Sequence, residues 1–107
     1  MATFSDKPWG AISEADYRDA EHFCASSLID MNEGSGAKVK EKCKLPVKEP
    51  EGATNRNAMR AASAALAGAR GGVQAPPEMK KMAAKKLMRM MMDAKMKPGD
   101  GLAMMAR

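Results

Sequence analysis

Methionine, alanine, leucine and valine must supply nearly all of the apolar volume of this chain, and that supply limits the fold. Among 107 residues there are twelve methionines but only four aromatic residues. A compact fold of this length buries roughly 65% of the surface that the unfolded chain exposes. With so few rings the core must be thin. The sequence therefore predicts one small domain that binding to partners helps to stabilise.

Charge is divided unevenly along the sequence. Residues 1–30 carry six acidic side chains against Lys7 and Arg18, whereas residues 31–107 carry sixteen lysines and arginines against seven acids. The formal charges of the two parts are therefore −4 and +9, within a net charge of +5. This division favours either an anionic partner for the C-terminal part or association between copies, with the acidic arm of one against the basic body of another.

A capping-box pattern marks the start of the first helix. Ser13 is placed to accept a hydrogen bond from the backbone N–H of Asp16, and the Asp16 side chain to accept one from the Ser13 N–H. The sequence therefore predicts a short acidic helix that ends at about His22 or Cys24. Residues 1–12 show no periodicity and are predicted to form an extended arm. The arm's two rings, Phe4 and Trp9, either fold back on the domain or anchor in a neighbouring subunit.

Two short segments around the glycine-rich stretch 32–36 predict a β-hairpin. In the second segment, apolar Val39, Cys43, Leu45 and Val47 alternate with Lys40, Lys42, Lys44 and Lys48. Pro46 cannot donate to a neighbouring strand, so this is an edge strand or its end. Its lysines either prevent unwanted strand pairing or, together with Lys38, contact nucleic acid.

Two longer helices are predicted after the hairpin. Thr54 or Asn55 is placed to cap an alanine-rich helix over about residues 56–69, which buries Met59, Ala62, Ser63, Leu66 and Ala69 and ends at the glycines around Gly71. Prolines suited to a first turn open the second helix, which runs to about Lys95. The two helices should pack antiparallel. The overall prediction is an α+β fold with an arm at residues 1–12, a domain at residues 13–96 and a tail at residues 97–107.

The second helix and the tail hold more apolar side chains than a domain of this size can cover. The methionines of the helix exceed a single stripe, so one face can pack on the preceding helix while another meets a partner. The adaptable thioether suits such a contact. The candidate partner-binding residues are Phe4, Trp9, Met88, Met91, Met92, Leu102, Met104 and Met105.

The chemical inventory predicts no catalytic residue, no cofactor and no metal site. His22 is the only histidine, and with Cys24 two positions away on a helix it points in another direction. A four-ligand zinc site would need carboxylates beside the two cysteines. Cys24 and Cys43 are either buried thiols or a disulfide formed in an oxidising medium; a bridge would stabilise the fold by about 3 kcal/mol through loop closure.

Membrane association is not expected. No apolar run approaches the roughly 18 to 20 residues that span a bilayer, and the N-terminal residues lack the basic flank and apolar stretch of a secretion signal. We therefore expect synthesis in the cytoplasm.

The order of the elements resembles a known family. The matching segments are Lys-Leu-Pro-Val-Lys-Glu-Pro-Glu-Gly from Lys44, Asn55-Arg56-Asn57, Gly71-Gly72-Val73, Ala75-Pro76-Pro77-Glu78 and Lys85-Lys86-Leu87. Over about residues 43–90 this resembles a small-domain family found in head-assembly regions of tailed bacteriophages. The resemblance implies a setting in the phage head and no active site. Where it leads us to expect alanines and then Leu-Tyr, this sequence has Met79, Met82, Met90 and Met91.

Three functions are compatible with these patterns. The first is a non-enzymatic virion protein, located in the capsid, that decorates or cements the head by binding the major capsid protein and copies of itself. The second is a basic accessory protein that binds nucleic acid, although the basic stretches lack the interleaved rings on which single strands stack. The third is an internal scaffold or assembly factor.

Overall fold

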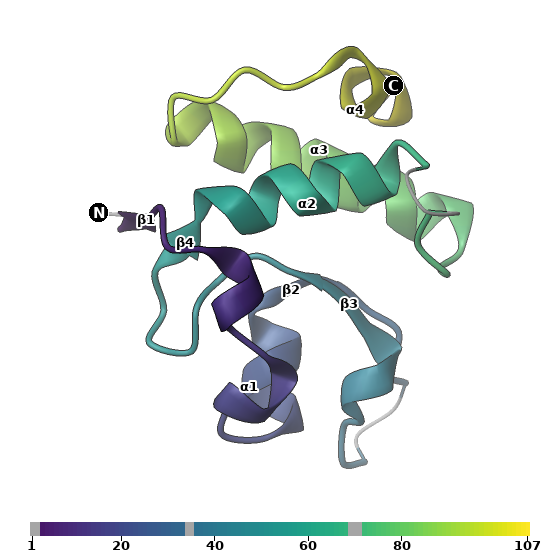
Figure 1. The fold of residues 1–107 in the computed structure, drawn as a ribbon. Coiled ribbons are helices and arrows are strands. Elements are labelled where there is room, and N and C mark those ends of the chain that lie inside the picture. Colours follow the sequence, from purple (N-terminus) through teal and green to yellow (C-terminus); the bar gives the residue numbers. More distant parts are fainter. Residues whose placement is uncertain (1–2, 34–35, 69–71) are drawn as a thin grey trace.

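Two helices form the centre of the fold, α2 (Arg56–Leu66) and α3 (Pro77–Asp93). They contact each other and run in opposite directions (Figure 1). The computed structural model describes residues 3–33, 36–68 and 72–107. In these ranges it has four α-helices and short strands, which confirms the α+β class.

Local sequence explains where α2 begins and which face it buries. The Asn55 side chain accepts a hydrogen bond from the Ala58 N–H at 2.8 Å, so Asn55 rather than Thr54 is the cap. The buried residues of α2 are Ala58, Met59, Ala62 and Leu66. Two of these side chains are alanine and one is the unbranched Met59, so the neighbouring helix approaches closely. The predicted end at Ala69 and Gly71 lies outside the described residues.

The predicted β-hairpin is confirmed but is shorter than expected. Strand β2 (Ser27–Asp30) pairs antiparallel with β3 (Cys43–Pro46), with Ile29 opposite Lys44. The second strand was expected to begin at Val39, which is wrong. Residues Lys40–Lys42 form a 3-10 turn, and the Val39 N–H donates to the Asn32 side chain at 2.9 Å instead of to a strand. The lysine alternation is therefore lost before Cys43.

The predicted first helix is divided into two pieces. A 3-10 turn covers Glu14–Asp16, the backbone at Tyr17 is extended, and α1 spans only Ala20–Ala25. Asp19 acts as a second cap, accepting from the His22 N–H at 2.8 Å. The extended backbone between the two pieces places Tyr17 in the core, where its hydroxyl donates to the Lys48 carbonyl oxygen. A single continuous helix would have lost that contact.

The two ends of the chain are folded onto the domain, so the prediction of extended arms is wrong. Strand β1 (Phe4–Ser5) pairs in parallel with β4 (Thr54–Asn55), next to the start of α2. The tail forms α4 (Asp100–Met105), which contacts α2 and α3. Gly101 permits this approach, because a Cβ there would lie 2.9 Å from the Ala67 Cβ. The chain itself buries Leu102 and partly covers Phe4, Trp9 and Met105.

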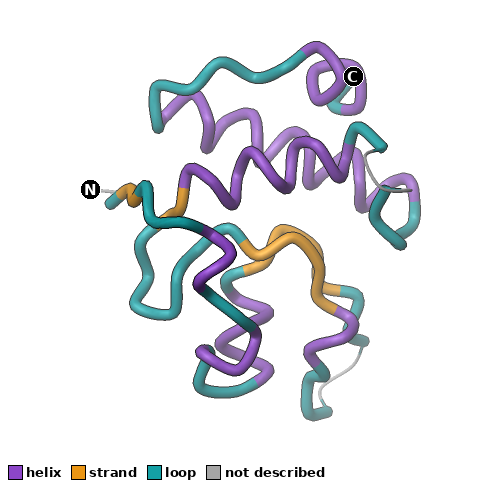
Figure 2. Tube along the Cα trace, in the orientation of Figure 1, coloured by secondary structure: helices purple, strands orange, loops and turns teal. Residues whose placement is uncertain are grey.

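Apolar side chains gather in two clusters. The larger lies among α2, α3 and α4 and includes Ile29 of β2 and Val47 after β3. The smaller contains Tyr17, Phe23, Cys24 and Cys43 between α1 and the hairpin. Figure 2 shows the same arrangement, with α2, α3 and α4 in one half and α1 with the hairpin in the other. In the described residues no helix is both long and apolar enough to cross a membrane.

One buried and one exposed residue of α3 test which face of this helix lies in the core. Leu87 is fully buried in the larger cluster, whereas Met82 is 71% exposed on the same helix. We expect Leu87→Ala to lower the free energy of unfolding by about 3 kcal/mol, and Met82→Ala to change it by less than about 0.5 kcal/mol. Urea denaturation followed by circular dichroism measures both, and equal effects would contradict the fold.

Candidate functional site

A groove between α3 and α4 combines exposed methionine with positive charge, and we call it the α3–α4 groove. Its volume is about 680 Å³. The lining residues are Lys85, Met88, Arg89, Met92, Ala103, Ala106 and Arg107. All three charged residues among them are cations. An apolar floor with a basic rim is suited to a segment that is apolar on one side and acidic on the other.

Helical spacing explains why this surface is left open. Leu87 and Met91 of α3 are buried against the larger cluster. Met88 and Met92 follow these residues by one position, which turns them about 100° away from α2. Met92 is consequently 66% exposed. The same turn carries Lys85 and Arg89 to the rim, because residues three or four apart share a helix face.

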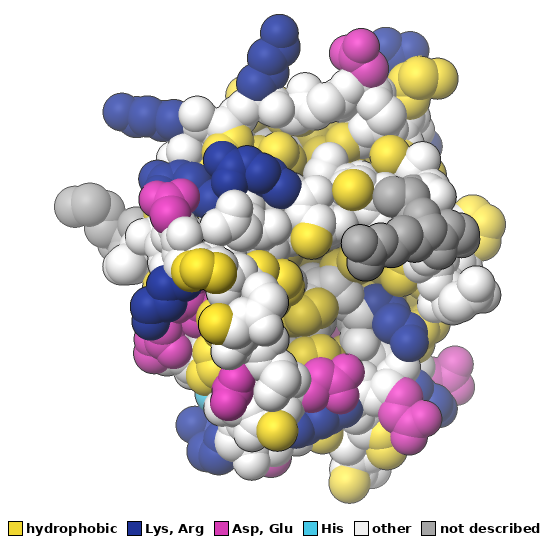
Figure 3. Space-filling view, in the orientation of Figure 1, with side chains coloured by type: hydrophobic (Ala, Val, Ile, Leu, Met, Phe, Trp, Pro, Cys, Tyr) yellow, Lys and Arg dark blue, Asp and Glu magenta, His cyan; other side chains and the backbone are white. Residues whose placement is uncertain are grey.

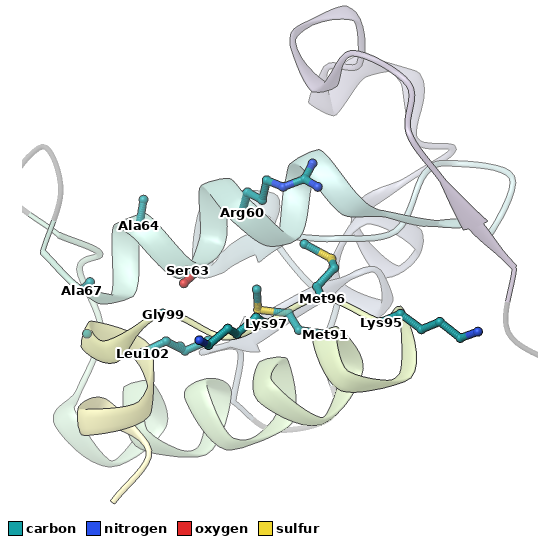
Figure 4. A pocket seen from close by; sticks show the side chains of 11 residues that line it. Arg60, Ser63, Ala64, Ala67, Met91, Lys95, Met96, Lys97, Gly99 and Leu102 are labelled. Atoms are coloured by element: carbon teal, nitrogen blue, oxygen red, sulfur yellow. The ribbon is translucent and has the colours of Figure 1, made fainter.

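A second hollow lies between α2 and the segment that leads into α4, and Figure 4 shows it from close by. Its volume is about 510 Å³, and Arg60, Lys95 and Lys97 are among its lining residues. In Figure 4 the Arg60 and Lys95 side chains point away from the floor, which Met91 and Met96 form. Arg60 also donates to the Asn57 side chain at 2.9 Å. These cations do not converge on one point, so the hollow is not a built anion site.

The structure separates the predicted partner-binding residues into three groups. Met91 and Leu102 are 4% and 1% exposed, so their prediction as partner contacts is wrong: the antiparallel helices and α4 bury them in the core. Phe4, Trp9, Met88 and Met105 are half-buried and pack against the same cluster. Met92 and Met104 are each 66% exposed. Met82, which was not among the predicted partner-binding residues, is also exposed.

The N-terminal rings are held by the chain's own residues. The Arg56 guanidinium lies over the Phe4 ring, 5.3 Å from its centroid, and Arg56 Nη1 donates to Asp6 Oδ2 at 2.8 Å. Trp9 lies in a 3-10 turn, Trp9–Ala11, against the larger cluster. These contacts favour the fold-back alternative over an anchor in a neighbouring subunit.

Two lysines of the expected basic row are engaged within the chain. Lys38 forms an ion pair with Asp30, and Lys40 Nζ donates to the Glu14 carbonyl oxygen at 2.8 Å. These two cations are satisfied by acceptors of the chain itself. The structure therefore offers less support for a phosphate-binding row than the sequence alternation did.

His22 is fixed by hydrogen bonds on both ring nitrogens. The Arg18 N–H donates to Nδ1 at 3.0 Å, which places the proton on Nε2, where it is donated to the Pro50 carbonyl oxygen at 2.8 Å. Cys24 is joined to Cys43 in a disulfide that links α1 to β3 across 5.3 Å between Cα atoms. The two side chains that sequence reasoning compared as base and nucleophile are thus both occupied by structural contacts.

Polar side chains surround the disulfide. The Asn32 Nδ2 amide donates to Asp30 Oδ1 at 2.8 Å and lies 3.3 Å from Cys43 Sγ and 3.6 Å from Cys24 Sγ. Burial raises the pKa of Asp30, but hydrogen bonds from Lys38 and Asn32 outweigh it and hold that pKa below its usual range. Asp30 is therefore an ionised carboxylate beside two sulfur atoms.

A buried carboxylate lies under the N-terminal strand. Glu49 is 1% exposed, and its Oε2 accepts from Asn55 Nδ2 at 2.8 Å. Lys7 Nζ lies 3.6 Å from the other oxygen. Burial disfavours the charged form, but hydrogen bonds with the side chains of Glu51, Ser5 and Asn55 and the Lys7 charge outweigh it and lower the pKa of Glu49 to about 2. The arm is thus held partly by an ionised buried group.

Comparisons with known proteins leave the chain's family open. No protein-family model matches it, and searches of curated proteins and of solved structures found no match.

The Glu49 network makes stability depend on pH. Because its folded pKa of about 2 lies below the ordinary 4.5, ionised Glu49 stabilises the fold above about pH 5, and this contribution is lost as the pH falls towards 2. We expect Glu49→Gln to be less stable at pH 7 and to lose less stability between pH 5 and pH 2. Urea titrations at several pH values measure this, and Glu41→Gln, on an exposed turn, should behave like the unsubstituted protein.

Proposed function

We propose that this chain is a structural virion protein that decorates or cements the head of a tailed phage by binding the major capsid protein through the α3–α4 groove. One observation carries the proposal. Met92 and Met104 are exposed although other apolar residues, from both ends of the chain, pack against the larger cluster. An apolar side chain that remains exposed under those conditions is available to a partner.

The chemistry of the groove supports a protein partner over a small molecule. Methionine side chains fit irregular surfaces because they are unbranched and polarizable. The groove is open, and its cations stand at the rim, where they steer an acidic partner more than they fix a ligand. A stable contact of this kind buries roughly 1,600 Å² in total. The surface of the groove alone is smaller than this area. Other exposed residues of α4, such as Met104, would therefore belong to the contact.

The distribution of charge supports contacts between copies. The acids of residues 14–21 lie on the 3-10 turn and α1, in the half of the molecule opposite α4 (Figure 1). In Figure 3 acidic side chains gather mainly over that half. The rim of the α3–α4 groove is basic. The half opposite α4 also carries Lys38, Lys40, Lys42, Lys44 and Lys48. Its acidic surface is therefore the segment 14–21. Copies arranged around a head could place that segment of one beside the basic groove of the next.

The family resemblance in the sequence adds the phage setting to this proposal. It contributes no residue-level role. Binding of duplex nucleic acid through the cations of α3 is the alternative, and it predicts an affinity that falls steeply with salt.

Particle composition tests the proposal. In head particles purified from the source, quantitative mass spectrometry should find this chain at a ratio to the major capsid protein near one or a simple fraction of it. Met92→Glu places a charge on the apolar floor and should lower that ratio at least tenfold. Met82→Glu, on the same helix outside the groove, should leave it unchanged.

Two results would contradict the proposal. One is absence of the chain from purified particles. The other is equal incorporation of Met92→Glu and Met82→Glu. Salt-sensitive binding to duplex DNA by a chain that is absent from particles would favour the nucleic-acid alternative.

A further inference from the structure

We propose that Cys24, Cys43 and Asp30 form a binding site for a thiophilic divalent cation, with Zn²⁺ as the probe, when the disulfide is reduced. The two sulfur atoms and a carboxylate oxygen of Asp30 lie within 4.8 Å of one another. Thiolate and carboxylate groups are established zinc ligands. The proposal is independent of the capsid function, because it uses the opposite half of the molecule.

The surroundings of Asn32 Nδ2 mark the position of the cation. This nitrogen has four acceptors around it: Asp30 Oδ1 at 2.8 Å, the Val39 carbonyl oxygen at 3.3 Å, Cys43 Sγ at 3.3 Å and Cys24 Sγ at 3.6 Å. An amide NH₂ has only two protons to donate. Asn32 Nδ2 therefore occupies the point on which two sulfurs and two oxygens converge. Two sulfurs and two oxygens around one point are a donor set for a tetrahedral cation.

The ligands come from three elements that the fold already holds together. Cys24 belongs to α1, Asp30 ends β2, and Cys43 begins β3 directly opposite Asp30 in the hairpin register. Both cysteines are buried and Asp30 is partly covered. Zinc binds sulfur at about 2.3 Å and oxygen at about 2.0 to 2.2 Å. The half-exposed Asn32 side chain would rotate outward and the ligands would move inward to reach these distances.

Lys38 orients the carboxylate. It pairs with Asp30 Oδ2, and this leaves Oδ1 directed at the two sulfurs and Asn32. A group that holds a ligand in this way is characteristic of metal sites, where it fixes the ligand's orientation.

The disulfide and the metal exclude each other. A dithiol reductant passes two electrons and two protons to the Cys24–Cys43 bond; the S–S bond breaks, two thiols form and the reductant becomes a disulfide. The cation then binds both sulfurs, and the two thiol protons go to solvent. A small-molecule disulfide reverses the sequence by exchange: it takes two electrons from the two thiolates and two protons from solvent to become two thiols, the S–S bond forms again and the cation is released. The same pair of residues thus crosslinks α1 to β3 by either a covalent bond or a metal.

Cobalt and zinc titrations of the full chain test the site. The protein is reduced with dithiothreitol, freed of it without air and titrated with Co²⁺, whose bonds to thiolates give a near-ultraviolet charge-transfer band. We expect one metal per chain, displacement by Zn²⁺ and two protons released. The disulfide form should show no band.

Variants distinguish a built site from two reactive thiols. Asp30→Asn keeps the shape of the side chain but removes its charge, and it should weaken zinc binding at least tenfold, measured by competition with a chromophoric chelator. Glu41→Gln, a nearby exposed acid, should bind like the unsubstituted protein. Cys24→Ser should abolish the charge-transfer band.

Folding is followed by circular dichroism in the same samples. If reduction loosens the chain, recovery of the folded spectrum with Zn²⁺ supports the site. No thiolate band in the reduced chain, or equal zinc affinity of Asp30→Asn and the unsubstituted protein, overturns the proposal.

Discussion

One buried side chain, Asn55, joins the parts of this fold. Its Oδ1 caps α2 by accepting from the Ala58 N–H, and its Nδ2 donates to Glu49 and to the Lys7 carbonyl oxygen. Its backbone N–H donates to the Val47 carbonyl oxygen. Three segments, the N-terminal one, residues 47–49 and the start of α2, therefore meet at one residue that is fully buried. Because each buried polar atom needs a partner, the position of the N-terminal strand, the turn around Glu49 and the start of α2 depend on one another.

Only the local half of that arrangement could be predicted from sequence. Caps, turns and helix faces depend on residues a few positions apart, so the start of α2, the β2–β3 hairpin and the extent of α3 were predictable. The pairing of β1 with β4 joins Phe4 to Thr54, fifty positions away. No periodicity in the sequence encodes such a contact. The division at Tyr17 was missed for the same reason, since its cause is a hydrogen bond to Lys48.

The methionine-rich helix shows the same limit at the level of single residues. Its pattern indicated that more methionines were present than one buried face needs, and Met82 and Met92 are exposed in the structure. The methionine pattern could not predict that Met91 is buried and Met92 exposed, because the face of α3 that is covered depends on where α4 packs. Gly101 fixes that position through its close approach to Ala67. The tail thus decides which part of α3 becomes a groove and which becomes core.

The two halves of the molecule are stabilised by different means, and this bears on how they can act. The half with α2, α3 and α4 depends on buried apolar side chains, which do not respond to redox conditions. The half with α1 and the hairpin has a small cluster that includes both cysteines. So few buried residues supply little apolar stabilisation, and the crosslink must contribute more there. The hairpin also contributes Ile29 to the larger cluster and contacts α2 and α3. A change at Cys24 and Cys43 should therefore act first on α1 and its attachment to β3, because the hairpin itself is also held by the helices.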